Sequence, residues 1–120
     1  MLNKRNRLTK RGSYTYVYKK GETRSVSNLR ITFVRGKGVP RVGISVPNSV
    51  GKAVVRNKVR RRIRAAMRGF VPYVKPAQLV ISAKAGAENL SYAQIEGALR
   101  ELLTRSGLYE KKEDNGGLRN

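Results

Sequence analysis

One segment of the chain, GKAVVRNKVRRRIRAAMRG from Gly51 to Gly69, most constrains how the whole chain can fold. It combines eight Lys or Arg residues, no acidic residue, and apolar residues that recur every three or four positions. This spacing predicts a helix with one side packed on a core, and Gly69 is predicted to end it. The core-facing residues are Val55, Val59, Ile63, Ala66, Met67 and Phe70.

The other side of this helix crowds like charges together. Arg56, Arg60, Arg64 and Arg68 follow one another at intervals of four, and each such pair of like charges costs a helix about 0.2–0.5 kcal/mol. No acid occurs between Glu22 and Glu88. A solvated charged face is the ordinary alternative, but solvated helices usually mix charges of both signs. We therefore expect the counter-charge to come from another molecule.

The composition indicates which class of molecule supplies this counter-charge. The chain has 120 residues and a net charge of +20, from 27 basic and 7 acidic residues, which indicates a polyanion. Nucleic acid is favoured over an anionic membrane, because the basic helix lacks the bulky Trp, Phe and Leu face of an interfacial helix. The candidate nucleic-acid-binding residues are Lys52, Arg56, Asn57, Lys58, Arg60, Arg61, Arg64 and Arg68. Arginine suits this role because its planar guanidinium grips phosphate in a fork.

Composition also argues against catalysis by the protein's own side chains. The chain contains no His and no Cys, and its single Asp is Asp114, close to the C-terminus. A nuclease that builds its own metal site needs clustered carboxylates, and the Glu residues before the tail are scattered. We therefore predict no catalytic residue and no protein-held metal. Any reacting groups are expected to belong to a partner.

The sequence predicts neither a membrane protein nor a secreted one. No apolar run approaches the roughly 20 residues of a membrane span. The basic N-terminus MLNKRNRLTKRG is not followed by an apolar signal region. We predict a cytoplasmic protein with no membrane partner and no small-molecule substrate.

The remaining patterns predict a small α+β sandwich. A helix is predicted over residues 9–21, capped by Thr9 and ended by Gly21, although the alternation of three tyrosines leaves a strand as the alternative. Residues 29–35 and 41–46 alternate and are predicted to pair as a hairpin. Residues 79–84 form a third strand, and a further short strand is possible. The last helix begins with a capping box of Ser91 and Gln94 and ends at Gly107. The order is α-β-β-α-β-α.

We expect one domain, over residues 9–109, between two flanking segments. Residues 1–8 are predicted to be a flexible basic arm, and residues 110–120 a polar, disordered tail. Within the domain, Tyr14, Tyr18 and Phe33 are candidates for a platform on which single-stranded bases stack. The alternative, that these rings belong to the core, is equally favoured by the sequence.

Two stretches carry a resemblance to a known family. RVGISVPNSVGKAVVRNKVRRRIR closely resembles the signature of the bacterial ribonuclease P protein subunit, and NRLTKRGSYTYVYKKG matches the opening of that family. The likeness extends over about residues 4–110. Three departures stand out: Pro47-Asn48-Ser49 replace a frequent Ser-Lys-Lys run, Gln78 replaces a common Asp, and Lys84 replaces a frequent Arg.

The resemblance implies a specific function. Members of the family fold as an α-β sandwich with a left-handed βαβ crossover, opposite to the usual hand. They bind a catalytic RNA, which uses Mg²⁺ to cut the 5′ leader from precursor tRNA. By this likeness Arg56, Asn57, Arg60, Arg61 and Arg64 contact the catalytic RNA. A cleft between the first helix and the sheet, with Tyr14, Tyr18 and Phe33, takes the single-stranded leader.

Three other functions remain open at this point. A ribosomal protein would share the charge and the size of this chain. An architectural DNA-binding protein would need a helix that reads a groove, whereas a basic helix packed on a sheet fits an RNA backbone better. A self-sufficient nuclease is the least favoured.

Overall fold

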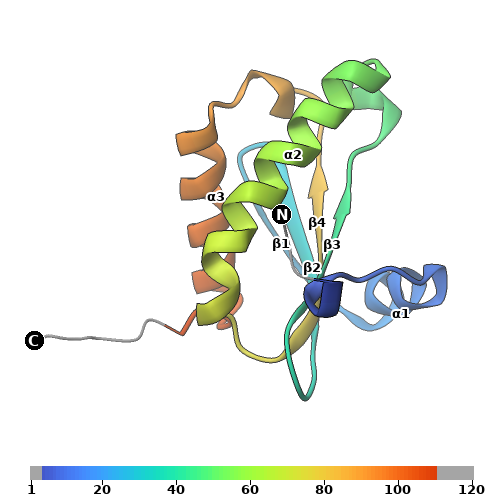
Figure 1. Cartoon of the computed structure of the whole chain (residues 1–120), viewed down its shortest axis with the longest axis vertical. Helices are drawn as coiled ribbons and strands as arrows, with labels where there is room; N and C mark the ends of the chain where they lie inside the picture. Colours follow the sequence, from blue (N-terminus) through green and yellow to red (C-terminus); the bar gives the residue numbers. More distant parts are fainter. Residues whose placement is uncertain (1–3, 111–120) are drawn as a thin grey trace, which may run out of the picture.

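The computed structural model describes residues 4–110, which form a sheet of four strands covered on both faces by helices (Figure 1). The helices are α1 (Arg11–Lys20), α2 (Ala53–Phe70) and α3 (Tyr92–Arg105). The strands are β1 (Glu22–Val26), β2 (Leu29–Arg35), β3 (Arg41–Ser45) and β4 (Ala77–Ala83). The α+β sandwich and its order of elements are confirmed, with β1 as the additional short strand.

The strand order in the sheet is β1-β2-β4-β3, so the predicted hairpin between residues 29–35 and 41–46 is wrong. β4 lies between these two strands, antiparallel to β2 and parallel to β3. Six of the seven residues of β4 are buried, which suits a central position. α2 supplies the long connection that two parallel neighbours need. The β3-α2-β4 unit is therefore present, while the left hand of its crossover stays a prediction.

The two faces of the sheet carry two separate apolar clusters. α2 and α3 cover one face, and α1 lies on the other (Figure 1). The larger cluster joins the sheet to α2 and α3 and includes Ile31, Leu79, Val59 and Leu99. The smaller one, of Leu8, Val17 and Val80, lies under α1 with Tyr14 packed against it. The basic helix thus packs its apolar side on the core, as its spacing predicts.

α1 crosses the strands over one row of residues, Gly43, Val80 and Thr32, which are paired across β3, β4 and β2. The ring of Tyr14 lies on Gly43, where a Cβ would come within 2.6 Å of it. At the other end of α1, a Cβ on Gly21 would come within 2.4 Å of the Val17 carbonyl oxygen. Gly21 has a φ of −84°, so glycine is needed there for close packing rather than for a left-handed turn.

The helix ends differ in part from the predicted ones. α1 has Lys10, not Thr9, at its N-cap, with no capping side chain. α2 runs one residue past Gly69, to Phe70. The capping box of α3 is confirmed: the Gln94 N–H donates to Ser91 Oγ at 3.1 Å and the Ser91 N–H to Gln94 Oε1 at 2.8 Å.

The described part of the predicted N-terminal arm packs against the fold. The Asn6 side-chain amide donates to the Pro40 carbonyl at 2.9 Å, and the Leu8 N–H donates to the Val42 carbonyl at 2.9 Å. Asn6 and Leu8 are buried, so residues 4–8 form part of the structure along the outer edge of β3. In the predicted tail, the Glu110 N–H donates to the Tyr73 carbonyl. Residues 1–3 and 111–120 lie outside the described residues.

Candidate RNA interface

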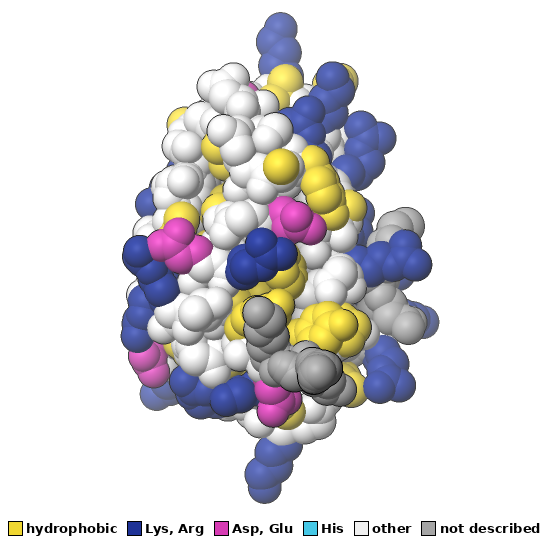
Figure 2. All heavy atoms as spheres, turned by 90° about the vertical axis from the view of Figure 1, so that its left-hand side faces the viewer, with side chains coloured by type: hydrophobic (Ala, Val, Ile, Leu, Met, Phe, Trp, Pro, Cys, Tyr) yellow, Lys and Arg dark blue, Asp and Glu magenta, His cyan; other side chains and the backbone are white. Residues whose placement is uncertain are grey.

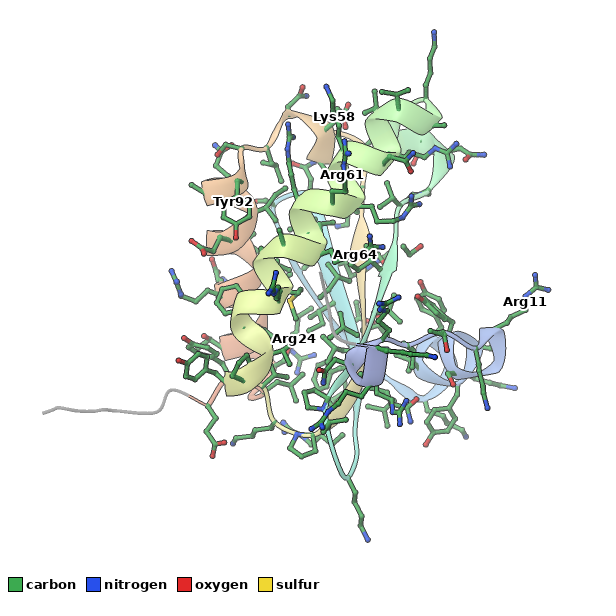
Figure 3. All side chains as sticks on the ribbon, viewed as in Figure 1. Arg11, Arg24, Lys58, Arg61, Arg64 and Tyr92 are labelled. Atoms are coloured by element: carbon green, nitrogen blue, oxygen red, sulfur yellow. The ribbon has the colours of Figure 1, made fainter. Side chains whose placement is uncertain are left out.

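The exposed side of α2 holds most of the predicted site residues. Lys52, Asn57, Lys58, Arg61 and Arg68 are exposed, and Arg56, Arg60 and Arg64 are partly exposed. Figure 3 shows Lys58 and Arg61 projecting from α2, with Arg64 on the side of the helix nearer to β3 and α1. Within residues 4–110, no cation of α2 forms an ion pair; the two ion pairs there are Arg24–Glu22 and Arg105–Glu101. The charge of α2 is therefore not neutralised by the described protein.

Two contacts hold the basic side of α2 in shape. Arg56 Nε donates to the Gly51 carbonyl at 3.1 Å, which fixes this side chain over the start of the helix. Arg60 Nη1 donates to Asn57 Oδ1 at 2.8 Å. A guanidinium oriented in this way loses less side-chain freedom when it binds a phosphate.

Arg62 differs from its neighbours. Its Nη1 donates to the Leu90 carbonyl at 3.1 Å, which joins α2 to the turn before α3. This arginine stabilises the packing of the two helices, and it is not among the predicted RNA-binding residues. The arginines of α2 are thus divided between structure and an open surface.

Tyr14 connects α1 to the basic side of α2. The ring is half-buried, and Tyr14 and Arg64 both line a hollow of about 210 Å³. Burial raises the pKa of the Tyr14 hydroxyl, while the Ile44 backbone N–H and the guanidiniums of Arg60 and Arg64 act in the opposite direction. Tyr14, one of the aromatic residues predicted for the leader cleft, therefore lies within the electrostatic influence of Arg60 and Arg64 on α2.

Tyr18 lies one turn after Tyr14 on the same flank of α1, because residues four apart share one side of a helix. Its side chain is 49% exposed. Tyr16, on the outer side of α1, is 48% exposed. Tyr14 and Tyr18 are thus placed together beside the sheet, with Tyr18 open to solvent.

Phe33 does not belong to this cleft, and its assignment is corrected. It is 2% exposed and lies in the larger cluster, on the sheet face opposite to α1. The guanidinium carbons of Arg24 and Arg35 lie 6.0 and 5.9 Å from the centre of its ring. A ring enclosed in this way cannot stack on a base that approaches α1.

A second hollow, of about 260 Å³, lies at the start of α1 and was missed by sequence reasoning. It is lined by Arg7, Leu8, Thr9, Lys10, Ser13, Arg41 and Gln78. Its basic residues, Arg7, Lys10 and Arg41, come from two separate segments, so only the fold brings them together. Net charge was the one signal in the sequence that pointed to them.

The face formed by α3 has a different character. Figure 2 shows acidic and apolar side chains on this face, with basic side chains mostly around its edges. α3 itself carries Glu96 and Glu101, and Tyr92 in its first turn is 45% exposed. α3 thus carries acidic as well as basic side chains, whereas α2 carries basic ones and no acidic one.

Comparisons with known proteins agree with this geometry. The family model described as Ribonuclease P matches residues 2–107. The chain belongs to the ribonuclease P protein family. It is 36% identical to the ribonuclease P protein component of Bacillus velezensis over 114 residues, which cover 92% of this chain and 97% of the relative. The match to the component from Clostridium kluyveri is 35% identical and covers 87% and 96%.

Solved structures of the family have the same fold. The ribonuclease P protein of Staphylococcus aureus superposes with a TM-score of 0.81 at 26% identity, covering 95% of this chain and 99% of that one. The protein from Thermotoga maritima gives 0.75 at 25% identity and covers 82% and 96%. The chain is therefore the protein component of an RNA–protein enzyme that processes tRNA, with the ribonuclease P RNA as its partner. This assignment decides against the ribosomal and DNA-binding alternatives.

Residues 4–110 contain neither a group of three or more His, Cys, Asp or Glu side chains that could hold a metal ion nor a helix that could span a membrane.

Proposed function

We propose that this protein holds the catalytic RNA on the basic side of α2 and the 5′ leader of precursor tRNA in the groove between α1 and the sheet. The observation that carries the proposal is the placement of Tyr14, which adjoins the hollow reaching Arg64 and feels the charges of Arg60 and Arg64. An RNA on α2 and a leader beside Tyr18 would thus lie next to each other.

The chemistry of α2 supports the catalytic RNA as its ligand. Its cations have no acidic partner among the described residues, so phosphates would supply the missing counter-charge. Phosphate contacts of this kind fix the position of an RNA without reading its sequence. A protein that binds one large folded RNA has to position that RNA and has little need to recognise its base sequence.

The chemistry of α1 supports a single-stranded leader. Tyr18 offers an exposed ring, and stacking on aromatic side chains is tolerant of base identity. Precursor tRNAs differ in their leaders, so a tolerant contact suits this substrate.

Mg²⁺ is proposed to act through the RNA. The described residues offer no cluster of carboxylates for a protein-held ion, and no step of this proposal passes through one. The protein would instead lower the Mg²⁺ concentration that the RNA needs, because its cations screen the same phosphates. The cytoplasmic location predicted from the sequence belongs to this proposal as well.

The test is to mix the purified protein with a bacterial ribonuclease P RNA and measure precursor tRNA cleavage across Mg²⁺ concentrations. We expect the RNA alone to cleave at high Mg²⁺, the mixture to cleave at lower Mg²⁺, and the protein alone not to cleave. An unchanged Mg²⁺ dependence would contradict the proposed role of the basic residues, and cleavage by the protein alone would contradict the absence of a catalytic residue.

Substitution of Tyr18 tests the leader groove. Tyr18→Ala should weaken binding of precursor tRNA to the protein–RNA complex by about 1–3 kcal/mol, the contribution of one stacked base, and leave mature tRNA binding unchanged. Tyr16→Ala is the matched control, because Tyr16 is equally exposed on another side of the same helix. Equal losses for precursor and mature tRNA, or equal effects of the two substitutions, would place the leader elsewhere.

A further inference from the structure

A row of polar side chains crosses the sheet beside α1. Ser45, Ser82, Arg30 and Ser25 are paired in register across β3, β4, β2 and β1. α1 covers the row of Gly43, Val80 and Thr32, and the polar row lies two residues further along each of these strands. Residues two apart in a strand point to the same face of the sheet. These four side chains therefore share the face of the sheet on which α1 lies.

The row lies along the flank of α1 that carries the tyrosines. Ser13 lines the second hollow, at the start of α1, together with Arg41 and Gln78. Its flank of α1 therefore faces the end of β3 and β4 that lies away from Ser45 and Ser82. Tyr14 and Tyr18 project from the other flank, since Ser13 and Tyr18 are separated by about 140° around the helix. The groove proposed for the leader thus has tyrosines as its wall and this polar row as its floor.

Ser82 is the unusual member of the row. Its side chain is 7% exposed, and within residues 4–110 its hydroxyl has no hydrogen-bond partner. A buried hydroxyl without a partner is destabilising and calls for an explanation. A ligand group that both donates and accepts a hydrogen bond would satisfy it.

Arg30 lies next to Ser82 on β2, is exposed, and forms no ion pair with any described residue. Neighbouring strands are about 4.8 Å apart, so a hydroxyl and a guanidinium are presented side by side. In RNA, a ribose 2′-hydroxyl and the phosphate next to it offer the matching pair of groups. The 2′-hydroxyl both donates and accepts, and it distinguishes RNA from DNA at a binding site.

We propose that Ser82 reads a ribose 2′-hydroxyl of the leader while Arg30 holds the adjacent phosphate, so that the groove selects RNA over DNA. This inference rests on the proposed function and adds to it a specificity for the sugar. The tyrosine wall cannot supply that specificity, because stacking involves the bases alone.

The experiment compares two precursor tRNAs that differ only in the leader, one all-ribose and one 2′-deoxy except at the nucleotides next to the cleavage site. The kcat/KM of the protein–RNA complex is measured for both. Wild-type protein should prefer the ribose leader by roughly two- to twelvefold, the contribution of one hydrogen bond. Ser82→Ala should reduce this ratio to about one by slowing the ribose substrate alone. Its melting temperature should be unchanged or higher, because an unsatisfied buried hydroxyl is removed.

Two matched variants complete the test. Arg30→Gln should slow both substrates by the same factor, since both keep the phosphate. Thr104→Ala, which removes an exposed hydroxyl from α3 on the opposite face of the sheet, should leave both rates and their ratio unchanged. A wild-type ratio of one, or a ratio that Ser82→Ala leaves intact, would overturn this inference and leave the proposed leader groove standing. If removal of the whole leader leaves substrate binding unchanged, both proposals fail together.

Discussion

The double variant Arg60→Ala/Arg64→Ala is expected to bind the catalytic RNA about 3–6 kcal/mol more weakly than the wild type. Hydrogen bonds to charged groups contribute about 1.5–3 kcal/mol each, and both arginines lie on the open side of α2. Each phosphate contact that is lost should also flatten the slope of log K against log salt concentration by about 0.7–0.9. Titration of the labelled RNA at several salt concentrations measures both quantities.

The control for this double variant lies on the same helix. Arg62→Ala removes one positive charge from α2, but Arg62 donates to the Leu90 carbonyl and supports the packing of α2 near α3. We expect it to lower the melting temperature and to leave the salt slope nearly unchanged. The double variant should show the reverse, because the one hydrogen bond that it loses within residues 4–110 is the exposed bond from Arg60 to Asn57. If the double variant melts early and keeps its RNA affinity, the basic side of α2 is structural and the assignment fails.

The sequence was sufficient for α2 because everything that defines this helix is local. The spacing of Val59, Ile63 and Met67 determines its buried side, and all three are fully buried in the structure. The arginines between them then have to point away from the core. No knowledge of the rest of the fold is needed for that conclusion.

The sequence was not sufficient for the sheet, because strand order depends on contacts between distant parts of the chain. β2 and β3 follow one another through a short loop, and adjacent strands often pair. β4 lies between them because α2 brings it back parallel to β3, and its buried side chains need neighbours on both edges. The short strand β1 carries too few apolar residues to be identified with certainty from its pattern.

Phe33 shows where a local pattern reaches its limit. The alternation of β2 places Phe33 on one face with Leu29 and Ile31, which the structure confirms. The sequence does not say which helix covers that face. Once α1 is found on the opposite face, above Thr32 and Val80, the ring can only be core.

The same limit explains why the row of Ser45, Ser82 and Arg30 has no signal in the sequence. Each residue is ordinary in its own strand, and they become neighbours only through the pairing of β3, β4 and β2. Tyr14 and Arg64 are likewise 50 positions apart in the chain and adjoin one hollow in the fold. The residues that we propose to form one site are thus far apart in the sequence.

Val59→Asp is expected to unfold the domain. Val59 is fully buried between α2 and the sheet, and an unpaired charge there costs more than the total stability of many small domains can offset. Circular dichroism should show loss of helix, and RNA binding should lose its specificity along with the fold. Val54→Asp is the matched control: Val54 is 69% exposed in the first turn of the same helix, where a negative charge favours the helix dipole by about 0.3–1 kcal/mol. It should therefore melt at or slightly above the wild-type temperature while weakening RNA binding, because it places an anion beside Lys52 and Arg56. A folded Val59→Asp protein would mean that this side of α2 is not packed on the core, and the division of the helix into a buried side and an RNA-binding side would have to be abandoned.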